Sequence, residues 1–250
     1  MLSDLPSPII FAHRGASAHA PENTLASFEL AAGEGADAIE LDAKLTADGH
    51  IVVFHDRTLE RTTNGTGQLA EKPLAELRAL DAGSAFSTKF RGEKIPLLEE
   101  VFEAVGKKLF INVHLTNHFS PRDELVERVC SLVTRCGLEK RVLFSSFLPY
   151  SLNKAKGLLP KVPRGLLAQK HWQGAWARSF GFSFGDYIAL HPYVTDVDVR
   201  EVQRVHRLKR RIHVWTVNKP ETIASLSTWG ADGIFTDDPA LALQVLGRQA

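Results

Sequence analysis

Short apolar, β-branched runs alternate with amphipathic helical patterns along almost the whole chain. The pattern predicts eight strands, over residues 9–13, 37–44, 109–114, 141–145, 164–168, 186–190, 212–217 and 232–236. It also predicts helices over Thr24–Glu34, Leu97–Val105, Pro121–Arg135, Tyr150–Leu158, Trp172–Phe180, Asp198–Leu208, Pro220–Trp229 and Pro239–Leu246. Repeated βα units build a parallel sheet, and eight of them close into a barrel. The sequence therefore predicts an α/β protein with a (β/α)8 TIM barrel fold.

Residues 46–96 interrupt this alternation, because they are too long for one crossover and rich in turn residues. Within them, Ile51–Phe54 is expected to form an extra strand, and the preceding Asp48-Gly49 is a hairpin signal. We therefore predict a small insertion after the second strand, within one domain that spans residues 1–250. Long loops at the carboxyl ends of barrel strands often carry active-site lids and specificity elements, so we expect this insertion to serve function.

Composition excludes several classes of protein. The chain has 250 residues, 44% of them hydrophobic and 24% charged, which is enough for a sizeable core and argues against global disorder. Its net charge of +1 gives no basic excess for a nucleic-acid partner, and the one dense basic cluster, Arg207–Arg211, falls at a predicted helix end. Neither a signal peptide pattern nor an apolar stretch of about 18 residues is present. We expect a cytoplasmic protein without stable membrane insertion, and leave open whether it forms a homo-oligomer.

The two cysteines, Cys130 and Cys136, fall six residues apart in one predicted helix and so lie on different faces of it. Their spacing is not the CxxC spacing of zinc or redox sites. We expect both to be small buried hydrophobic residues in a reducing compartment.

Polar side chains gather at the carboxyl ends of the predicted strands, where barrel enzymes hold their active sites. These residues are His13, Arg14, Glu40, Asp42, Lys44, His55, Asp56, Asn112, His114, Ser145, Ser146, Gln169, Lys170, His191 and Trp215. Glu40, Asp42 and Lys44 are spaced by two residues, so they leave the same face of the second strand. Two such carboxylates repel each other, and a hard cation such as magnesium, calcium or manganese relieves the repulsion. A structural ion pair network with Arg14 and Lys44 is the alternative, but burying two carboxylates without a metal is costly.

The chain has ten histidines, and a single histidine near a strand end is more often structural than catalytic. We expect functional roles chiefly for His13 and His55. Structural roles are expected for the four histidines His118, His171, His206 and His213. Trp215 either fills the top of the barrel or contacts the carbon skeleton of a small ligand.

An ordered set of short motifs resembles the glycerophosphodiester phosphodiesterase family, and most closely its soluble bacterial cytoplasmic branch. The likeness covers nearly the whole chain, and the set in this order is specific where any one tripeptide would be weak. The motifs are His13-Arg14-Gly15, Pro21-Glu22-Asn23-Thr24, Glu40-Leu41-Asp42, Thr46 to Gly49, His55-Asp56, Leu59 to Gly65, Trp215-Thr216-Val217-Asn218 and Gly233 to Asp237. That family is a (β/α)8 barrel with a small insertion after the second strand, which agrees with the pattern described above.

The resemblance implies hydrolysis of a small glycerophosphodiester to sn-glycerol 3-phosphate and an alcohol, with Mg²⁺ or Ca²⁺ as cofactor. It implies that His13 and His55 are the acid and base, that Arg14 holds the phosphate, and that Glu40 and Asp42 bind the metal. The chemistry agrees, because cleaving a phosphodiester requires charge neutralisation, a base for the attacking hydroxyl and an acid for the leaving oxygen. Histidine titrates near the required pH and serves in either proton role.

The chain departs from the family at the end of the third strand. The family usually has Asn, an apolar residue, Glu, an apolar residue and Lys there, whereas this chain has Asn112-Val113-His114-Leu115-Thr116. His114 therefore stands where the third metal ligand is a glutamate, and imidazole is neutral and softer than carboxylate. We expect a Glu40, Asp42 and His114 site that favours Mn²⁺, Co²⁺ or Zn²⁺ over Ca²⁺. Thr116 replaces a lysine near the phosphate, and we expect Lys44 to compensate because it leaves the same strand face as both carboxylates.

Two further hypotheses compete with hydrolysis. The loss of one metal-binding carboxylate could leave a barrel that binds a phosphoryl ligand with weak or no turnover. Alternatively, a hydroxyl of the substrate itself could replace water, as in a lysophospholipase D type of reaction that forms a cyclic phosphate. An amidohydrolase barrel is disfavoured, because Ala12-His13-Arg14 lacks the HxH pair of that class. The sequence does not identify the alcohol moiety.

Overall fold

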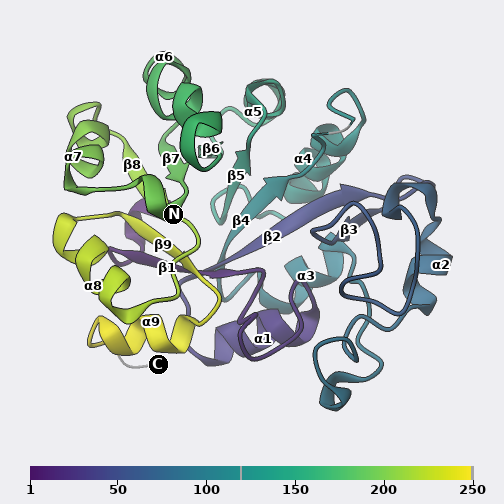
Figure 1. The fold of residues 1–250 in the computed structure, drawn as a ribbon. Helices are drawn as coiled ribbons and strands as arrows, with labels where there is room; N and C mark the ends of the chain where they lie inside the picture. Colours follow the sequence, from purple (N-terminus) through teal and green to yellow (C-terminus); the bar gives the residue numbers. More distant parts are fainter. Residues whose placement is uncertain (119, 249–250) are drawn as a thin grey trace.

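The computed structural model describes residues 1–118 and 120–248, and within them eight parallel strands close into a barrel with helices around it (Figure 1). The strand order is β1-β9-β8-β7-β6-β5-β4-β2, and β1 pairs with β2 to close the ring. The barrel strands are β1 (Ile9–His13), β2 (Ala38–Leu45), β4 (Phe110–Leu115), β5 (Val142–Ser146), β6 (Arg164–Ala168), β7 (Ala189–Pro192), β8 (Arg211–Val214) and β9 (Gly233–Thr236). The predicted (β/α)8 TIM barrel is confirmed.

Helix boundaries follow their capping residues. The regular outer helices are α1 (Leu25–Gly33), α3 (Leu98–Val105), α4 (Leu125–Arg135), α5 (Pro149–Leu158), α7 (Val199–Arg207), α8 (Pro220–Trp229) and α9 (Pro239–Val245). Thr24, Asp198 and Asp238 are N-caps whose side chains accept hydrogen bonds from backbone N–H groups in the first turn. The predicted helix start at Pro121 was wrong, because a turn precedes α4 and the Asp123 carboxylate accepts from the N–H of Leu125.

The segment between β6 and β7 is not the regular helix that was predicted over Trp172–Phe180. It consists of a 3-10 helix, η4 (His171–Gly174), a π-helix, η5 (Ala177–Gly181), and a short α6 (Phe182–Phe184). His171 has a positive φ of 58°, which interrupts the approach to a regular helix. The Arg178 guanidinium also draws the segment back over the strand end, because it donates to the carbonyls of Gln169 and His171.

Two predicted strands were misplaced along the chain. The strand predicted at 186–190 is β7, which begins only at Ala189, because Asp186 lies outside the barrel and binds Arg164 and Lys156. The strand predicted at 212–217 is β8, which ends at Val214. The next residue, Trp215, turns its indole N–H to the carbonyl of His191 on the neighbouring strand.

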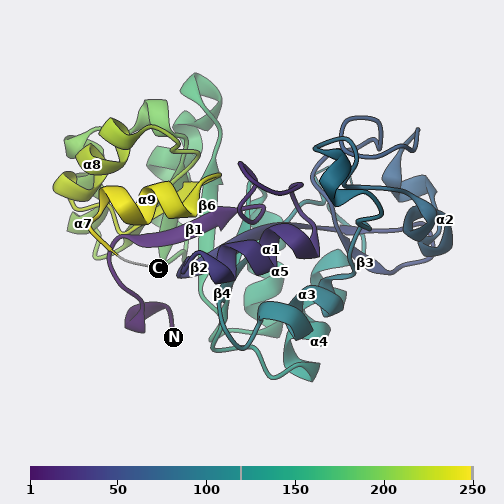
Figure 2. The same ribbon diagram turned by 90° about the horizontal axis from the view of Figure 1, so that it is seen from below.

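The predicted insertion after the second strand is present. It contains β3 (Ile51–Val53), which pairs antiparallel with β2, followed by η2 (Leu69–Glu71), α2 (Leu74–Ala79) and η3 (Thr88–Phe90). It has its own small apolar cluster, made of Val52, Phe54, Leu59, Leu69, Leu77, Ala82 and Ile95. Figures 1 and 2 show it projecting from the barrel on the side away from α7, α8 and α9.

The barrel interior is mostly apolar towards its amino-terminal end, where the buried pair His191 and His213 packs among aromatic rings, and is polar towards its carboxyl-terminal end. The buried apolar cluster inside the barrel consists of Leu2, Ile9, Phe11, Ala38, Phe110, Leu143 and Phe235. Leu2 belongs to the short helix η1 (Leu2–Asp4), which therefore packs against this end. Burying each large side chain contributes about 1.5–3 kcal/mol, so this layer is a firm base for the polar groups of the same strands. Among the described residues, the helices are too short or too polar to cross a membrane.

Candidate active site

A cavity of about 220 Å³ opens among the carboxyl ends of the barrel strands. Its lining residues are His13, Arg14, Glu40, Asp42, His55, Asn112, His114, Ser145, Phe147, Leu167, Gln169, Trp215 and Phe235. Seven of the eight predicted site residues are therefore brought together, although some lie on strands more than 200 residues apart in the sequence. Lys44 is the predicted residue that is not part of the lining.

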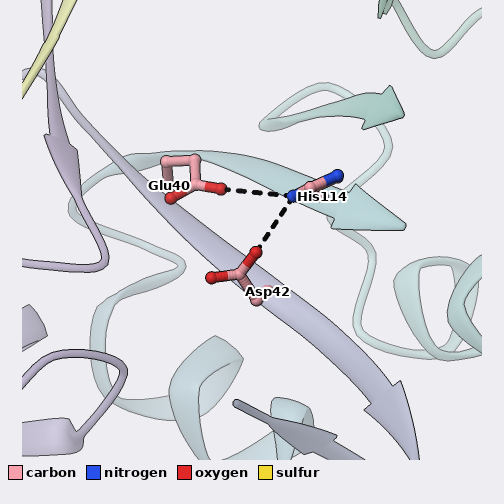
Figure 3. Close-up of side chains that lie close together, drawn as sticks. All are labelled: Glu40, Asp42 and His114. Atoms are coloured by element: carbon pink, nitrogen blue, oxygen red, sulfur yellow. Dashed lines mark hydrogen bonds and ion pairs between the residues drawn. The ribbon is translucent and has the colours of Figure 1, made fainter. Parts of the chain in front are cut away.

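Glu40 and Asp42 on β2 and His114 on β4 form a compact cluster at one wall of the cavity (Figure 3). In the parallel register Asp42 lies opposite His114, so the alternation of side chains along both strands aims all three inward. His114 Nδ1 lies 2.9 Å from Asp42 Oδ1 and 3.9 Å from Glu40 Oε1. Each residue offers a ligand atom, and these atoms lie within 4.8 Å of one another.

Charge and burial of the cluster fit a cation. Burial, together with the charge of Asp42, raises the pKa of Glu40 well above its usual range. Burial acts the same way on Asp42, but the hydrogen bond to His114 and the charge of Arg14 outweigh it and hold the pKa of Asp42 well below its usual range. Nδ1 of His114 faces both carboxylates (Figure 3), whereas its buried Nε2 on the far side of the ring has no hydrogen-bond partner among the described residues. Two carboxylates and one imidazole therefore form a donor set that a divalent cation would satisfy.

Arg14 turns back towards the cluster immediately after β1. Its φ of 58° lies in the left-handed region, and its backbone N–H points at Glu40, donating to the backbone carbonyl (3.0 Å) and to Oε2 (3.3 Å). Its guanidinium lies 2.8 Å from Glu22 Oε1 and 3.5 Å from Asp42 Oδ2. The next residue must be glycine, because Gly15 has a φ of 86° and a Cβ there would lie 2.3 Å from Ser27 Oγ.

His13 is held by an aspartate from the other end of the barrel sequence. Its Nδ1 lies 2.7 Å from Oδ1 of Asp237, which follows β9. Asp237 also accepts hydrogen bonds from Ser17 Oγ and Asn218 Nδ2. Burial opposes ionisation of Asp237, but these donors outweigh it and lower its pKa. A carboxylate at Nδ1 fixes the imidazole orientation and leaves Nε2 for proton transfer.

His55 is held in the same way by its neighbour in the insertion. Its Nδ1 lies 2.6 Å from Asp56 Oδ1, and the other oxygen of Asp56 accepts from Arg61 Nε at 2.6 Å. The hydrogen bond from Arg61 is the main reason that the pKa of Asp56 falls to about 2. Arg61 also donates to both oxygens of Glu22, which binds Arg14. The insertion thus supplies one of the two histidines and ties it to the barrel.

Lys44 and Trp215 lie in different positions relative to the cavity. Lys44 is half-buried, and burial lowers its pKa while the charges of Asp42 and Asp56 oppose that shift. It lies beside the cluster, outside the cavity lining, so its contact with substrate stays a prediction. Trp215 lines the cavity, and its ring meets the Phe147 ring edge-on at 5.9 Å.

His191, which the sequence placed at the rim, is instead fully buried inside the barrel. Its Nε2 lies 3.1 Å from Nδ1 of His213, and burial lowers the pKa of His191 to about 3. His118 was expected to be structural, but it lies beside the cavity with its ring 5.5 Å from that of His114.

Sequence reasoning gave no role to several residues that hold the site together. Asn23 donates to Asp42 Oδ2 at 2.9 Å, Glu22 bridges two arginines, and Asp237 orients His13. A signal was available for Asp237, because it follows a barrel strand directly, as His13 does. Glu22 and Asn23 precede a helix rather than follow a strand, so the strand-end rule could not single them out.

Comparisons with known proteins agree with this geometry. A model of the glycerophosphoryl diester phosphodiesterase family matches residues 13–241. The chain is 38% identical to the glycerophosphodiester phosphodiesterase of Caldanaerobacter subterraneus, over 96% of this chain and 98% of that one. It is 53% identical to a probable glycerophosphodiester phosphodiesterase 1 of Mycobacterium tuberculosis, over 93% of this chain and 90% of that one.

A solved structure shares the whole fold. It is a phosphodiesterase of Oleispira antarctica in complex with the product sn-glycerol-3-phosphate, with a TM-score of 0.89, 33% identity and 98% of each chain covered. The resemblance noted in the sequence is thus supported over nearly the whole chain. The chain belongs to the glycerophosphoryl diester phosphodiesterase family, and the prediction that it is a phosphodiester hydrolase is confirmed.

Proposed function

We propose that the protein hydrolyses glycerophosphodiesters to sn-glycerol 3-phosphate and an alcohol, with a divalent cation bound by Glu40, Asp42 and His114. One observation carries the proposal. Two histidines that come from different parts of the chain line the same cavity as the cluster, and each has an aspartate at Nδ1, at 2.7 Å and 2.6 Å. A binding protein needs no such pair, whereas general acid and base catalysis does.

Each lining group has a chemical task in this proposal. When bound, the cation neutralises charge that develops on the phosphoryl oxygens. The Arg14 guanidinium lies beside the cluster and holds the phosphate. One of His13 and His55 takes a proton from the attacking water, and the other gives a proton to the leaving alcohol oxygen. Trp215 and Phe147 form an apolar wall on which the carbon skeleton of the substrate packs.

The metal preference follows from His114. A neutral imidazole in place of a carboxylate removes one negative charge and adds a nitrogen donor, which suits borderline metals better than calcium. We therefore propose that Mn²⁺, Co²⁺ or Zn²⁺ supports activity better than Ca²⁺. To bind a cation, His114 must turn a lone pair towards the carboxylates, and its Nδ1 already faces both of them (Figure 3).

The test is product release from glycerophosphocholine by the chelator-treated protein after addition of single metals. We expect sn-glycerol 3-phosphate to appear with Mn²⁺, Co²⁺ or Zn²⁺, and phosphorus NMR to show a phosphomonoester. Absence of product with every metal, together with stabilisation by glycerol 3-phosphate, would favour a binding protein. A cyclic phosphate product would show that a substrate hydroxyl replaces water.

We also propose that the protein works as one domain in the cytoplasm. Both thiols are free in the structure, which suits a reducing compartment. The insertion packs its own apolar cluster, yet Arg61 and Asp56 tie it to the catalytic wall of the barrel.

A further inference from the structure

Four aromatic side chains form an exposed stripe along the segment between β6 and β7. Trp172, Trp176, Phe180 and Phe184 follow one another at intervals of four residues and are 82%, 57%, 68% and 84% exposed. The rings of Phe180 and Phe184 stack with their centroids 6.0 Å apart. Soluble proteins rarely leave aromatic residues of this size in a row facing water, and such rows mark surfaces that bind something.

The stripe is the outer face of a firmly anchored amphipathic segment. Ala177 and Phe182, on its inner face, are buried in the main core. Arg178 holds the segment, because it donates to the carbonyls of Gln169 and His171 and pairs with Asp196. The Trp176 ring lies over Gly181, where an added Cβ would come within 2.6 Å of the ring. The exposed rings are therefore displayed on an ordered support.

The part of the chain that contains the stripe is basic. Residues 169–211 contain eight Lys and Arg and four Asp and Glu, which makes +4, whereas the whole chain is +1. Helix α7 and the turn after it lie against the stripe segment, because Arg204 donates to the carbonyl of Arg178 and Arg210 to that of Phe182. Arg200 and Arg207 of α7, and Lys209 just after it, are exposed. The remaining residues, 1–168 and 212–250, therefore sum to −3.

We propose that this aromatic stripe and its basic surroundings dock the protein on the surface of an anionic lipid bilayer. Tryptophan and phenylalanine rings partition into the boundary between headgroups and acyl chains, and flanking Lys and Arg side chains pair with anionic headgroups. The protein lies on the membrane with the stripe segment in the interface and does not span it.

A second copy of the chain is the competing occupant, and two features disfavour it. The four rings expose roughly 500–700 Å², estimated from about 150–250 Å² for each aromatic side chain, which is less than the about 800 Å² per partner of a stable interface. Two copies joined through this face would also bring two +4 surfaces together, and like charges repel.

Docking would bring the catalytic cavity close to lipid headgroups. Trp172 begins the stripe three residues after Gln169, which lines the cavity. Phosphodiesters carried by lipids would then reach the site from the membrane, and this last step rests on the proposed function. The docking itself does not depend on turnover.

The experiment measures binding of the full chain to sedimenting vesicles, one set of pure phosphatidylcholine and one of equal parts phosphatidylcholine and phosphatidylglycerol. We expect binding to the anionic vesicles, weakened by 0.5 M salt, with a blue shift of tryptophan fluorescence. The combined variant Trp172→Ser, Trp176→Ser, Phe180→Ser and Phe184→Ser should bind at least ten-fold more weakly. The matched control is Tyr150→Ser with Leu158→Ser, which removes two exposed apolar side chains from α5 and should bind like wild type.

Three results would overturn the proposal. The first is wild-type protein that stays in the supernatant with anionic vesicles, and the second is a stripe variant that binds these vesicles as well as wild type does. The third is a wild-type protein that forms a dimer, a stripe variant that is monomeric, and no binding of either protein to vesicles. Hydrolysis of soluble glycerophosphocholine is measured in parallel, and the stripe variant should keep wild-type rates, which shows that it is folded. If no form hydrolyses that substrate, the proposed function fails while the vesicle result still decides the docking.

Discussion

Replacing Asp237 with asparagine should disable His13 without changing the shape of the site. Both oxygens of Asp237 act only as acceptors: Oδ1 from His13 and Ser17, and Oδ2 from Asn218 Nδ2. Asn218 cannot turn to relieve a conflict, because its Oδ1 accepts from the N–H of Asp237 and from Thr236 Oγ1. An asparagine therefore presents an NH₂ group to a donor in either orientation.

The size of the effect follows from these two orientations. If the new NH₂ faces His13, Nδ1 must become an acceptor and the proton moves to Nε2, which gives the wrong tautomer for a base. If it faces Asn218 instead, two donors meet and a charge-assisted hydrogen bond worth about 1.5–3 kcal/mol is lost. General acid or base catalysis contributes about 10²–10⁴ in rate. We expect kcat to fall by about 10²–10⁴, with KM changed less than three-fold.

The assay is steady-state release of sn-glycerol 3-phosphate from glycerophosphocholine at saturating metal. Asp238→Asn is the matched control, because Asp238 is the next residue, caps α9 and makes no contact with His13, and asparagine caps as well as aspartate. A kcat of Asp237→Asn within three-fold of the wild-type value, or an equal loss of kcat in Asp238→Asn, would refute the role of Asp237 in orienting His13. Thermal unfolding checks that both variants are folded.

Further predictions test the metal, the phosphate and the barrel interior. His114→Glu should move the metal preference towards Ca²⁺ and Mg²⁺ in activity after chelation, and an unchanged preference would contradict the role of His114. Lys44→Met should raise KM if its ammonium reaches the phosphate, and unchanged kinetics would exclude that contact. Gly165→Ala should destabilise the fold by about 1–3 kcal/mol in chemical unfolding, because its Cβ would lie 2.3 Å from His191 Nε2; wild-type stability would mean that His191 moves freely. Burial lowers the pKa of His191 to about 3, so on acidification this histidine is protonated in the unfolded state before it is protonated in the folded state. The free energy of unfolding should therefore fall as the pH drops from about 6.5 towards 3, and it should fall less steeply in His191→Gln.

Periodicity and turn chemistry were sufficient for most of the fold. The strand that ends at His13 and the helices capped by Thr24 and Asp198 were predicted almost to the residue, because alternation and caps are local signals. The strand predicted at 186–190 begins three residues too early. The prediction counted Tyr187 as a strand residue because it is apolar, but Tyr187 is buried in the segment before β7. The irregular helix after β6 begins at a left-handed residue, His171, and the helical periodicity of the segment gives no sign of that conformation.

The sequence predicted those site residues that lie at the ends of strands, but it did not predict the contacts that hold them in place. Glu40, Asp42 and His114 share inward faces, which alternation alone requires. The contact of His13 with Asp237 joins residues 224 positions apart, and it exists only because β1 and β9 are neighbours in the closed barrel. His191 shows that a position near a strand end does not by itself predict a site residue. It lies near the end of β7, but its side chain is buried deep inside the barrel and does not reach the rim.

The two histidines differ in how their supports connect to the metal cluster. A continuous chain of ion pairs runs from Asp42 through Arg14, Glu22, Arg61 and Asp56 to His55. His13 has no place in it, because Asp237 binds Ser17 and Asn218 instead. This network of ion pairs alternates three carboxylates with two guanidiniums, so the network carries a net charge of −1 before Glu40 is counted. A cation at the cluster therefore compensates this whole network as well as its own ligands. Because His55 also interacts electrostatically with Asp42 and His114, a change at His114 should affect His55 more than His13.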